Sequence, residues 1–112
     1  MEKTNPDLIT VLGDTAQDNR NYPATTNFAN LVKYIDSFDI PWAPIFGNHD
    51  HDTYSPGYDS PKGVSDEWIM AQFASAENCI FMEGLDSVDG CGNYIVHIKE
   101  QGTDKLIRAL YF

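Results

Sequence analysis

The chain has 112 residues, a length that suits one domain at most. Its 17 acidic residues outnumber its 7 basic ones, so the net charge at pH 7 is −10. Because such a surface repels phosphate backbones, we expect no binding to nucleic acid. No apolar run approaches the roughly 18 residues of a membrane span, and no charged-then-apolar leader opens the chain. We therefore expect a soluble chain with no membrane partner, and its localisation is left unknown.

The first half of the sequence predicts a strand, a helix and a second strand. Residues 7–12 form a short apolar run that stops at Gly13, as in a buried strand feeding a loop. Apolar residues within 26–38 then follow the spacing of one helical face, with Thr25 or Thr26 as N-cap. This predicted core stripe consists of Phe28, Leu31, Val32, Ile35 and Phe38. A second buried strand is expected at 42–46, although prolines there weaken the case for a central strand.

The second half predicts a polar loop, a helix and a hairpin. After the loop at 49–63, Ser65 begins a helix whose first turn is acidic, which suits the helix dipole. Residues 79–82 are expected to form a brief strand. The alternation of apolar residues at 94–98 and the apolar run at 105–112 predict an antiparallel hairpin. The two cysteines, Cys79 and Cys91, fit no disulfide framework, and we expect buried free thiols.

This element order indicates an α/β or α+β fold. The chain ends inside an apolar run, at Leu110-Tyr111-Phe112, where a natural domain seldom stops because the open edge is hard to leave exposed. We therefore expect residues 1–112 to be a partial domain, truncated at both ends. A partial domain leaves apolar faces uncovered, so self-association through them is expected.

Two short polar motifs follow the first two predicted strands. Gly13-Asp14 ends the first, and Gly47-Asn48-His49-Asp50 ends the second. If these strands are parallel neighbours, both motifs emerge at one edge of the sheet, where open α/β sheets usually build their sites. A carboxylate can bridge two cations, an amide oxygen can bind one, and an imidazole can handle a proton. The pair of motifs therefore suggests a metal-dependent phosphoesterase.

These motifs resemble the second and third signature blocks of the calcineurin-like metallophosphoesterases. The resemblance extends to the residues before each block, 6–9 and 40–43, and to Gly92-Asn93-Tyr94 and 109–112. The Gly-Asn-His-Asp block is fairly specific, whereas Gly-Asp alone is very common. The family implies a layered β-sandwich flanked by helices, of which this chain would supply about half.

The resemblance also implies the chemistry. The function would be hydrolysis of a phosphate-ester substrate at a binuclear site holding two metal ions among Mn, Fe and Zn. Asp14 would bridge the metals and Asn48 would bind one of them. His49 would act near the leaving-group oxygen or the phosphoryl oxygens, and Asp50 would orient His49. The simpler reading of each residue is a loop or turn position, a frequent role for Asp and Asn.

The sequence departs from the family pattern in several places. The family's first block, an Asp followed two residues later by His or Asn, is missing upstream of Asp14. The downstream Gly-His-x-His block is also missing. Position 17 is Gln where the second acid of the Gly-Asp-x-x-Asp block is expected, and the next acid is Asp18. Two ligands cannot hold two cations tightly, so we expect the isolated chain to be inactive or nearly so.

Two other functions remain open. The first is an acidic cation-binding or interaction module without catalysis, suggested by the acidic residues Asp50, Asp52, Asp59, Asp66 and Glu67. The segment that starts at Asp50 nevertheless lacks the ligands and the glycine of a calcium-binding EF loop. The second is a degenerate phosphoesterase that keeps the fold but has lost the metals.

Overall fold

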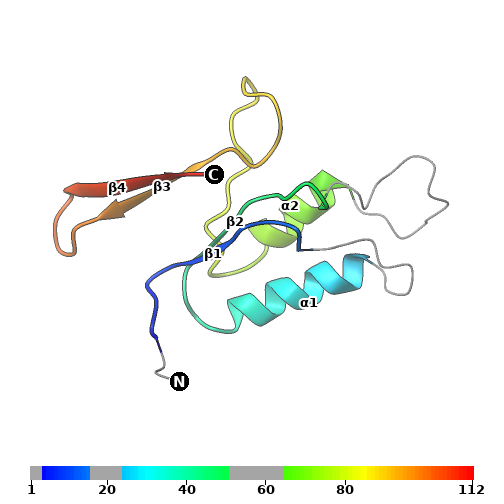
Figure 1. Cartoon of the computed structure of the whole chain (residues 1–112), viewed down its shortest axis with the longest axis horizontal. Coiled ribbons are helices and arrows are strands. Elements are labelled where there is room, and N and C mark those ends of the chain that lie inside the picture. Colours follow the sequence, from blue (N-terminus) through cyan, green and yellow to red (C-terminus); the bar gives the residue numbers. More distant parts are fainter. Residues whose placement is uncertain (1–3, 16–23, 51–64) are drawn as a thin grey trace. The chain divides into compact units, whose positions relative to one another are not determined.

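The computed structural model describes residues 4–15, 24–50 and 65–112. Within these ranges the chain forms two helices and four short strands (Figure 1). Their order is β1 (Ile9–Val11), α1 (Ala24–Asp36), β2 (Trp42–Pro44), α2 (Asp66–Ala74), β3 (Ile95–Lys99) and β4 (Leu106–Tyr111). This is the mixed α/β class that the sequence predicts. The chain divides into two compact units, Met1–Phe81 and Met82–Phe112, each of which is described by itself.

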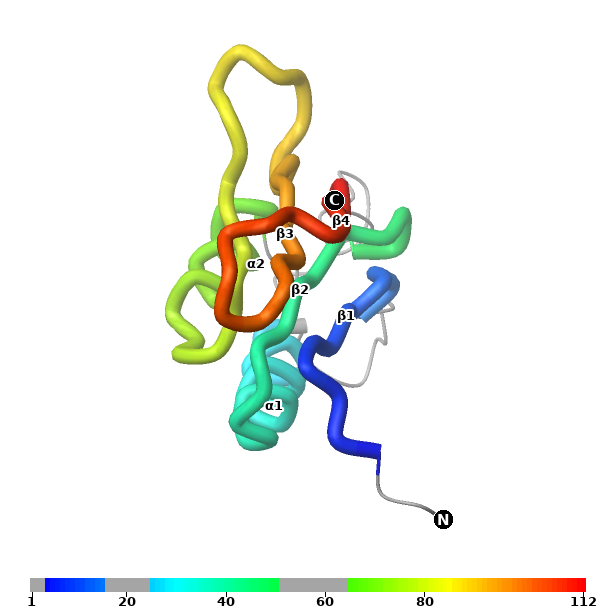
Figure 2. Tube along the Cα trace, turned by 90° about the vertical axis from the view of Figure 1, so that its left-hand side faces the viewer, coloured from blue at the N-terminus to red at the C-terminus, as the bar shows by residue number. Residues whose placement is uncertain are grey.

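The first unit is built on a β-α-β arrangement. β1 and β2 are parallel partners, with Ile9 opposite Trp42 and Val11 opposite Pro44. The two strands run side by side in Figure 2. Both are shorter than predicted. Pro44 is tolerated because the N–H of Ile45, rather than that of residue 44, donates to the Val11 carbonyl at 2.9 Å. The parallel pairing brings the carboxyl ends of both strands to the same edge of the sheet.

Helix α1 places one apolar face on the core. Phe28, Val32 and Ile35 are buried, and they join Trp42 of β2 and two residues of α2 in one cluster. Two details of the prediction are wrong. The helix begins at Ala24, so Thr25 and Thr26 lie inside it rather than at the N-cap. Phe38 lies beyond the helix end and is 47% exposed, because its ring packs on Tyr34 at the surface instead of entering the core.

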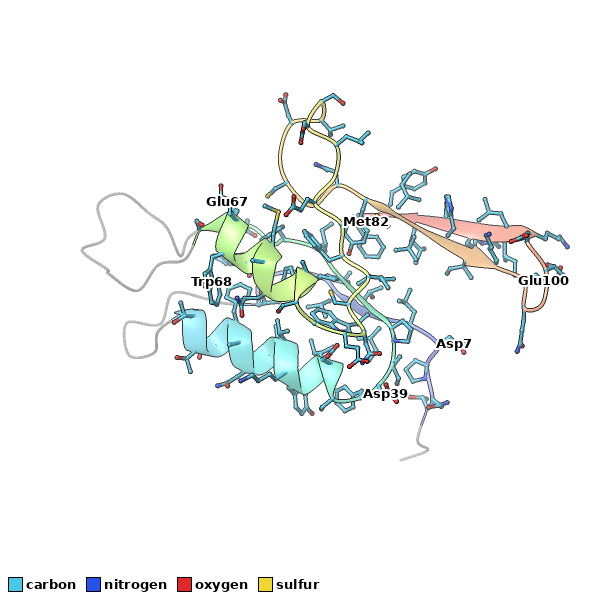
Figure 3. The ribbon with its side chains drawn as sticks, turned by 180° about the vertical axis from the view of Figure 1, so that it is seen from behind. Asp7, Asp39, Glu67, Trp68, Met82 and Glu100 are labelled. Atoms are coloured by element: carbon cyan, nitrogen blue, oxygen red, sulfur yellow. The ribbon has the colours of Figure 1, made fainter. Side chains whose placement is uncertain are left out.

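Helix α2 completes the core. Its N-cap is Ser65, whose hydroxyl accepts the Trp68 N–H at 3.3 Å, as predicted. Glu67 points away from α1, whereas Trp68 lies on the side of α2 toward α1 (Figure 3). Phe73 is the centre of the cluster, with ring centroids 5.5–6.4 Å from those of Phe28, Trp42, Phe46 and Phe81. Neither helix in the described ranges is long and apolar enough to cross a membrane.

The segment after α2 lies along β2 without forming a strand. Trp42 donates its N–H to the Asn78 carbonyl and accepts the N–H of Ile80. This contact is an isolated parallel bridge to Cys79, so the strand predicted at 79–82 is wrong. Both cysteines are half-buried, and Cys79 is a free thiol. Burial raises the pKa of the Cys79 thiol to about 11.

Asp36, the last residue of α1, ties this segment to the core. Its Oδ1 accepts the Trp42 indole N–H at 3.0 Å and the Asn78 backbone N–H at 2.9 Å. Its Oδ2 accepts the Glu77 N–H at 3.2 Å. The indole donor above all, together with the backbone donors, holds the pKa of this carboxyl below its ordinary value of 3.8.

The second unit is the predicted antiparallel hairpin. β3 pairs with β4 in a register that sets Ile95 opposite Tyr111 and His97 opposite Ala109. Tyr94 stacks on Phe112 at a ring-centroid distance of 4.9 Å, and their backbones exchange two hydrogen bonds. His97 is exposed. Many large apolar side chains are also exposed on this unit, namely Met82, Leu85, Val88, Ile95, Ile98, Leu106, Ile107 and Tyr111. Self-association through them stays a prediction.

The hydrogen bonds of Asp36 predict a pH-dependent stability. Because the pKa of the folded carboxyl lies below 3.8, its contribution is complete above that value and is lost as the pH falls through the folded pKa. Asp36→Asn should lower the free energy of unfolding by about 1 kcal/mol near neutral pH. The difference from the wild type should shrink on going from about pH 6 to pH 3. Urea denaturation at several pH values measures it.

Asp7→Asn is the matched control, since Asp7 is an exposed acid of the same unit. It should leave the free energy of unfolding near neutral pH close to that of the wild type. An Asp36→Asn curve that stays parallel to the wild-type curve across this pH range would contradict the assignment.

Candidate functional site

The predicted site residues lie on two loops that meet at the carboxyl edge of the parallel sheet. Gly13 and Asp14 follow β1, and residues 45–50 follow β2. The adjacent pairing of β1 and β2 brings together residues that are 35 positions apart in the sequence, such as Asp14 and His49. The two motifs therefore share one edge of one sheet.

Glycines allow the two loops to touch through their backbones. A Cβ added at Gly13 would collide with the backbone nitrogen of Gly47 and would lie 2.8 Å from the carbonyl carbon of Phe46. A Cβ at Gly47 would collide with the nitrogen and Oδ1 of Asp14. Gly13 also has a φ of +80°, a value that residues other than glycine rarely adopt. The close approach thus requires glycine on both sides.

Asp14 is exposed and has the left-handed φ of +51° that Asp tolerates better than most residues. Its Oδ1 accepts the backbone N–H of His49 at 3.0 Å. Its Oδ2 has no hydrogen-bond partner among the described residues. One carboxylate oxygen of Asp14 is therefore fixed against the second loop, and the other is open to an external ligand.

Asp50 is buried, with 1% of its surface exposed. Its Oδ1 accepts the Thr15 N–H at 2.8 Å and the Thr15 hydroxyl at 2.7 Å. Its Oδ2 accepts the Asp14 N–H at 3.0 Å and the Gly47 N–H at 2.7 Å. Burial of a carboxylate is strongly unfavourable unless hydrogen-bond donors replace the lost water, and these four donors do so.

The other two predicted residues lie beside Asp14. Asn48 is exposed and His49 is half-buried. With Asp14 they give this edge a carboxylate oxygen, an amide and an imidazole, the oxygen and nitrogen donors that suit a divalent metal. Across residues 4–15, 24–50 and 65–112, no group of three or more His, Cys, Asp and Glu side chains could hold a metal ion. The described residues therefore do not form a complete metal site by themselves.

Thr15 is a site residue that the sequence analysis missed. Its N–H and hydroxyl both bind Asp50, and its position directly after Gly13-Asp14 was the one signal available. Of the other residues considered from the sequence, Gln17, Asp18, Asp52 and Asp59 lie outside the described residues.

The contact between the loops predicts a large effect of a single methyl group. Gly13→Ala places a side chain at positive φ, which costs about 1–3 kcal/mol, and adds a collision with backbone atoms that no rotamer change relieves. Gly102→Ala is the matched control, because Gly102 has a similar φ of +78° but nothing within 4 Å of an added Cβ. Urea denaturation should show the greater loss of stability for Gly13→Ala. Equal losses would mean that the loops are not in contact.

One comparison with known proteins identifies a family. The family model for calcineurin-like phosphoesterases matches residues 1–109, nearly the whole chain. Searches among curated proteins and among solved structures gave no match. The family match spans both loops of the site and the core that supports them. The chain belongs to the calcineurin-like phosphoesterase family.

Proposed function

We propose that the protein hydrolyses phosphate esters at a two-metal site, of which these residues carry part. The family implies phosphoesterase activity and divalent metals in general. The main support for a metal site at these residues is the position of the Asp14 side chain. The His49 N–H fixes its Oδ1, and the exposed carboxylate lies beside Asn48. An acid held in this way can bind a cation without first losing much side-chain freedom.

The donor chemistry supports metal binding at this edge. Carboxylate and amide oxygens and an imidazole suit the ions Mn, Fe and Zn, and they do not select among the three. Bound metal ions supply Lewis acidity to the phosphoryl group and lower the pKa of water. We propose Asp14 as the ligand shared by both ions and Asn48 as a ligand to one. The remaining ligands would come from other parts of the full-length protein.

The other residues of the second loop would act on the substrate. His49 directly follows the proposed ligand Asn48, and its backbone is tied to Asp14. From this position its imidazole would supply a proton to the departing alcohol oxygen or stabilise charge on the phosphoryl oxygens. The backbone contact between the loops would keep His49 and Asp14 at a constant spacing during the reaction. The net charge of −10 favours small esters over nucleic acid as substrates.

The geometry gives less support to a calcium-binding module. Such a module would use Asp50 as a ligand, but the Asp50 carboxylate is buried and already accepts four hydrogen bonds. Moving it to a cation would leave backbone N–H groups of both loops without acceptors. A degenerate phosphoesterase that has lost the metals is an outcome that the following experiment detects.

Asn48→Ala tests the proposed function directly. In the full-length gene product with Mn²⁺ added, it should lower the rate of phosphate-ester hydrolysis by at least about 100-fold, because mutation of residues that merely support metal ligands already costs about 10–100-fold. Asn30→Ala, at an exposed position of α1, is the matched control and should retain full activity.

Activity that survives Asn48→Ala would refute the role of this loop. A wild-type protein that neither binds Mn²⁺ nor hydrolyses any ester would instead identify the degenerate form. Calorimetric titration with Mn²⁺, performed on the same samples, distinguishes these two results.

A further inference from the structure

Four donors to Asp50 among the described residues come from both loops of the site. The N–H groups of Asp14 and Thr15, and the Thr15 hydroxyl, belong to the loop after β1. The N–H of Gly47 belongs to the loop after β2, which also carries Asp50 itself. One buried carboxylate therefore bonds to both loops, and the neighbouring residues Asp14 and Asn48 are exposed.

The structure assigns Asp50 as the positioning residue of this site, with Thr15 as its hydroxyl partner. Its carboxylate sets the Asp14 side chain against the Asn48-His49 backbone, and this spacing determines how well the loop edge receives a cation. The inference deepens the proposed function and rests on it for the identity of the ligand as a divalent metal. It gives Asp50 a different role from the one that the family resemblance implies, which is orientation of His49.

The hydrogen-bond pattern makes the carboxylate difficult to replace, even by its isostere. Each oxygen of Asp50 accepts two donors, so an amide must turn its NH₂ group toward one pair of them. Toward Oδ2 it would face two backbone N–H groups, those of Asp14 and Gly47. Toward Oδ1 it would face the Thr15 N–H, while the Thr15 hydroxyl could rotate to accept. Asp50→Asn therefore leaves at least one buried N–H unsatisfied, which separates the loops.

The test compares five variants of the full-length protein, one of which is the double variant that combines Asp50→Asn with Thr15→Val. Asp50→Asn removes the double acceptor, Thr15→Val removes the hydroxyl donor, and Thr15→Ser restores it. Asp36→Asn is the matched control, because Asp36 is also a carboxylate that accepts backbone N–H groups in the same unit but lies away from the loops. For each variant we would measure the Kd of Mn²⁺ alone by calorimetry, the thermal midpoint, and the amide hydrogen exchange of Asp14 and Gly47.

The positioning role predicts a specific pattern in these measurements. Asp50→Asn should weaken Mn²⁺ binding by about 10–100-fold, Thr15→Val by a smaller factor, and Thr15→Ser hardly at all. The effects of Asp50→Asn and Thr15→Val should be non-additive, because both act on one network. Amide exchange at Asp14 and Gly47 should accelerate in Asp50→Asn. Asp36→Asn should lower the thermal midpoint without changing the Kd, which separates positioning from general stability.

Each failure has its own meaning. Unchanged Mn²⁺ affinity in Asp50→Asn, with normal binding by the wild type, would overturn the positioning role and leave the proposed function standing. Unchanged amide exchange would show that the carboxylate does not hold the loops. Absence of Mn²⁺ binding by the wild type would count against both proposals. If Asp50→Asn does not fold, the comparison of Thr15→Val with Thr15→Ser decides, and equal affinities would overturn the inference.

Discussion

The contact between the two loops depends on the hydrogen bonds that the Asp50 carboxylate accepts. This carboxylate is nearly inaccessible to water, and its hydrogen bonds join the loops after β1 and β2. Direct backbone contact at Gly13 and Gly47 accompanies these bonds. The buried acid and the two glycines act together, because the donors reach Asp50 only if the loops approach this closely. The same two loops carry Asp14, Asn48 and His49.

The core below the sheet explains why the loops can be held so firmly. Phe73 of α2 contacts aromatic rings from α1, β2 and the segments after β2 and α2. β2 is hydrogen-bonded on both edges, to β1 on one side and to residues 78–80 on the other. A rigid central strand limits the movement of the loop that follows it.

The sequence predicts the meeting of the two motifs better than it predicts the boundaries of the elements. Gly13-Asp14 and the Gly47–Asp50 block are visible as motifs, and their meeting follows from the pairing of two consecutive parallel strands. The role of Asp50 cannot be predicted in this way, because it depends on which N–H groups of a distant loop point toward it. Phe38 shows a second limit, since helical spacing places it on the apolar face but the helix ends at Asp36. Pro44 shows a third limit. A strand tolerates this proline because the N–H of Ile45 donates to the partner strand, and the spacing of apolar residues does not reveal which N–H groups do so.

We propose that a divalent cation binds where the two loops meet. Paramagnetic broadening of amide resonances by substoichiometric Mn²⁺ tests it most directly, because this effect detects even weak binding by the 112-residue chain. We expect the amides of Asp14, Asn48 and His49 to broaden first. Broadening centred on the acidic first turn of α2, at Asp66 and Glu67, or spread evenly over the acidic surface, would contradict it.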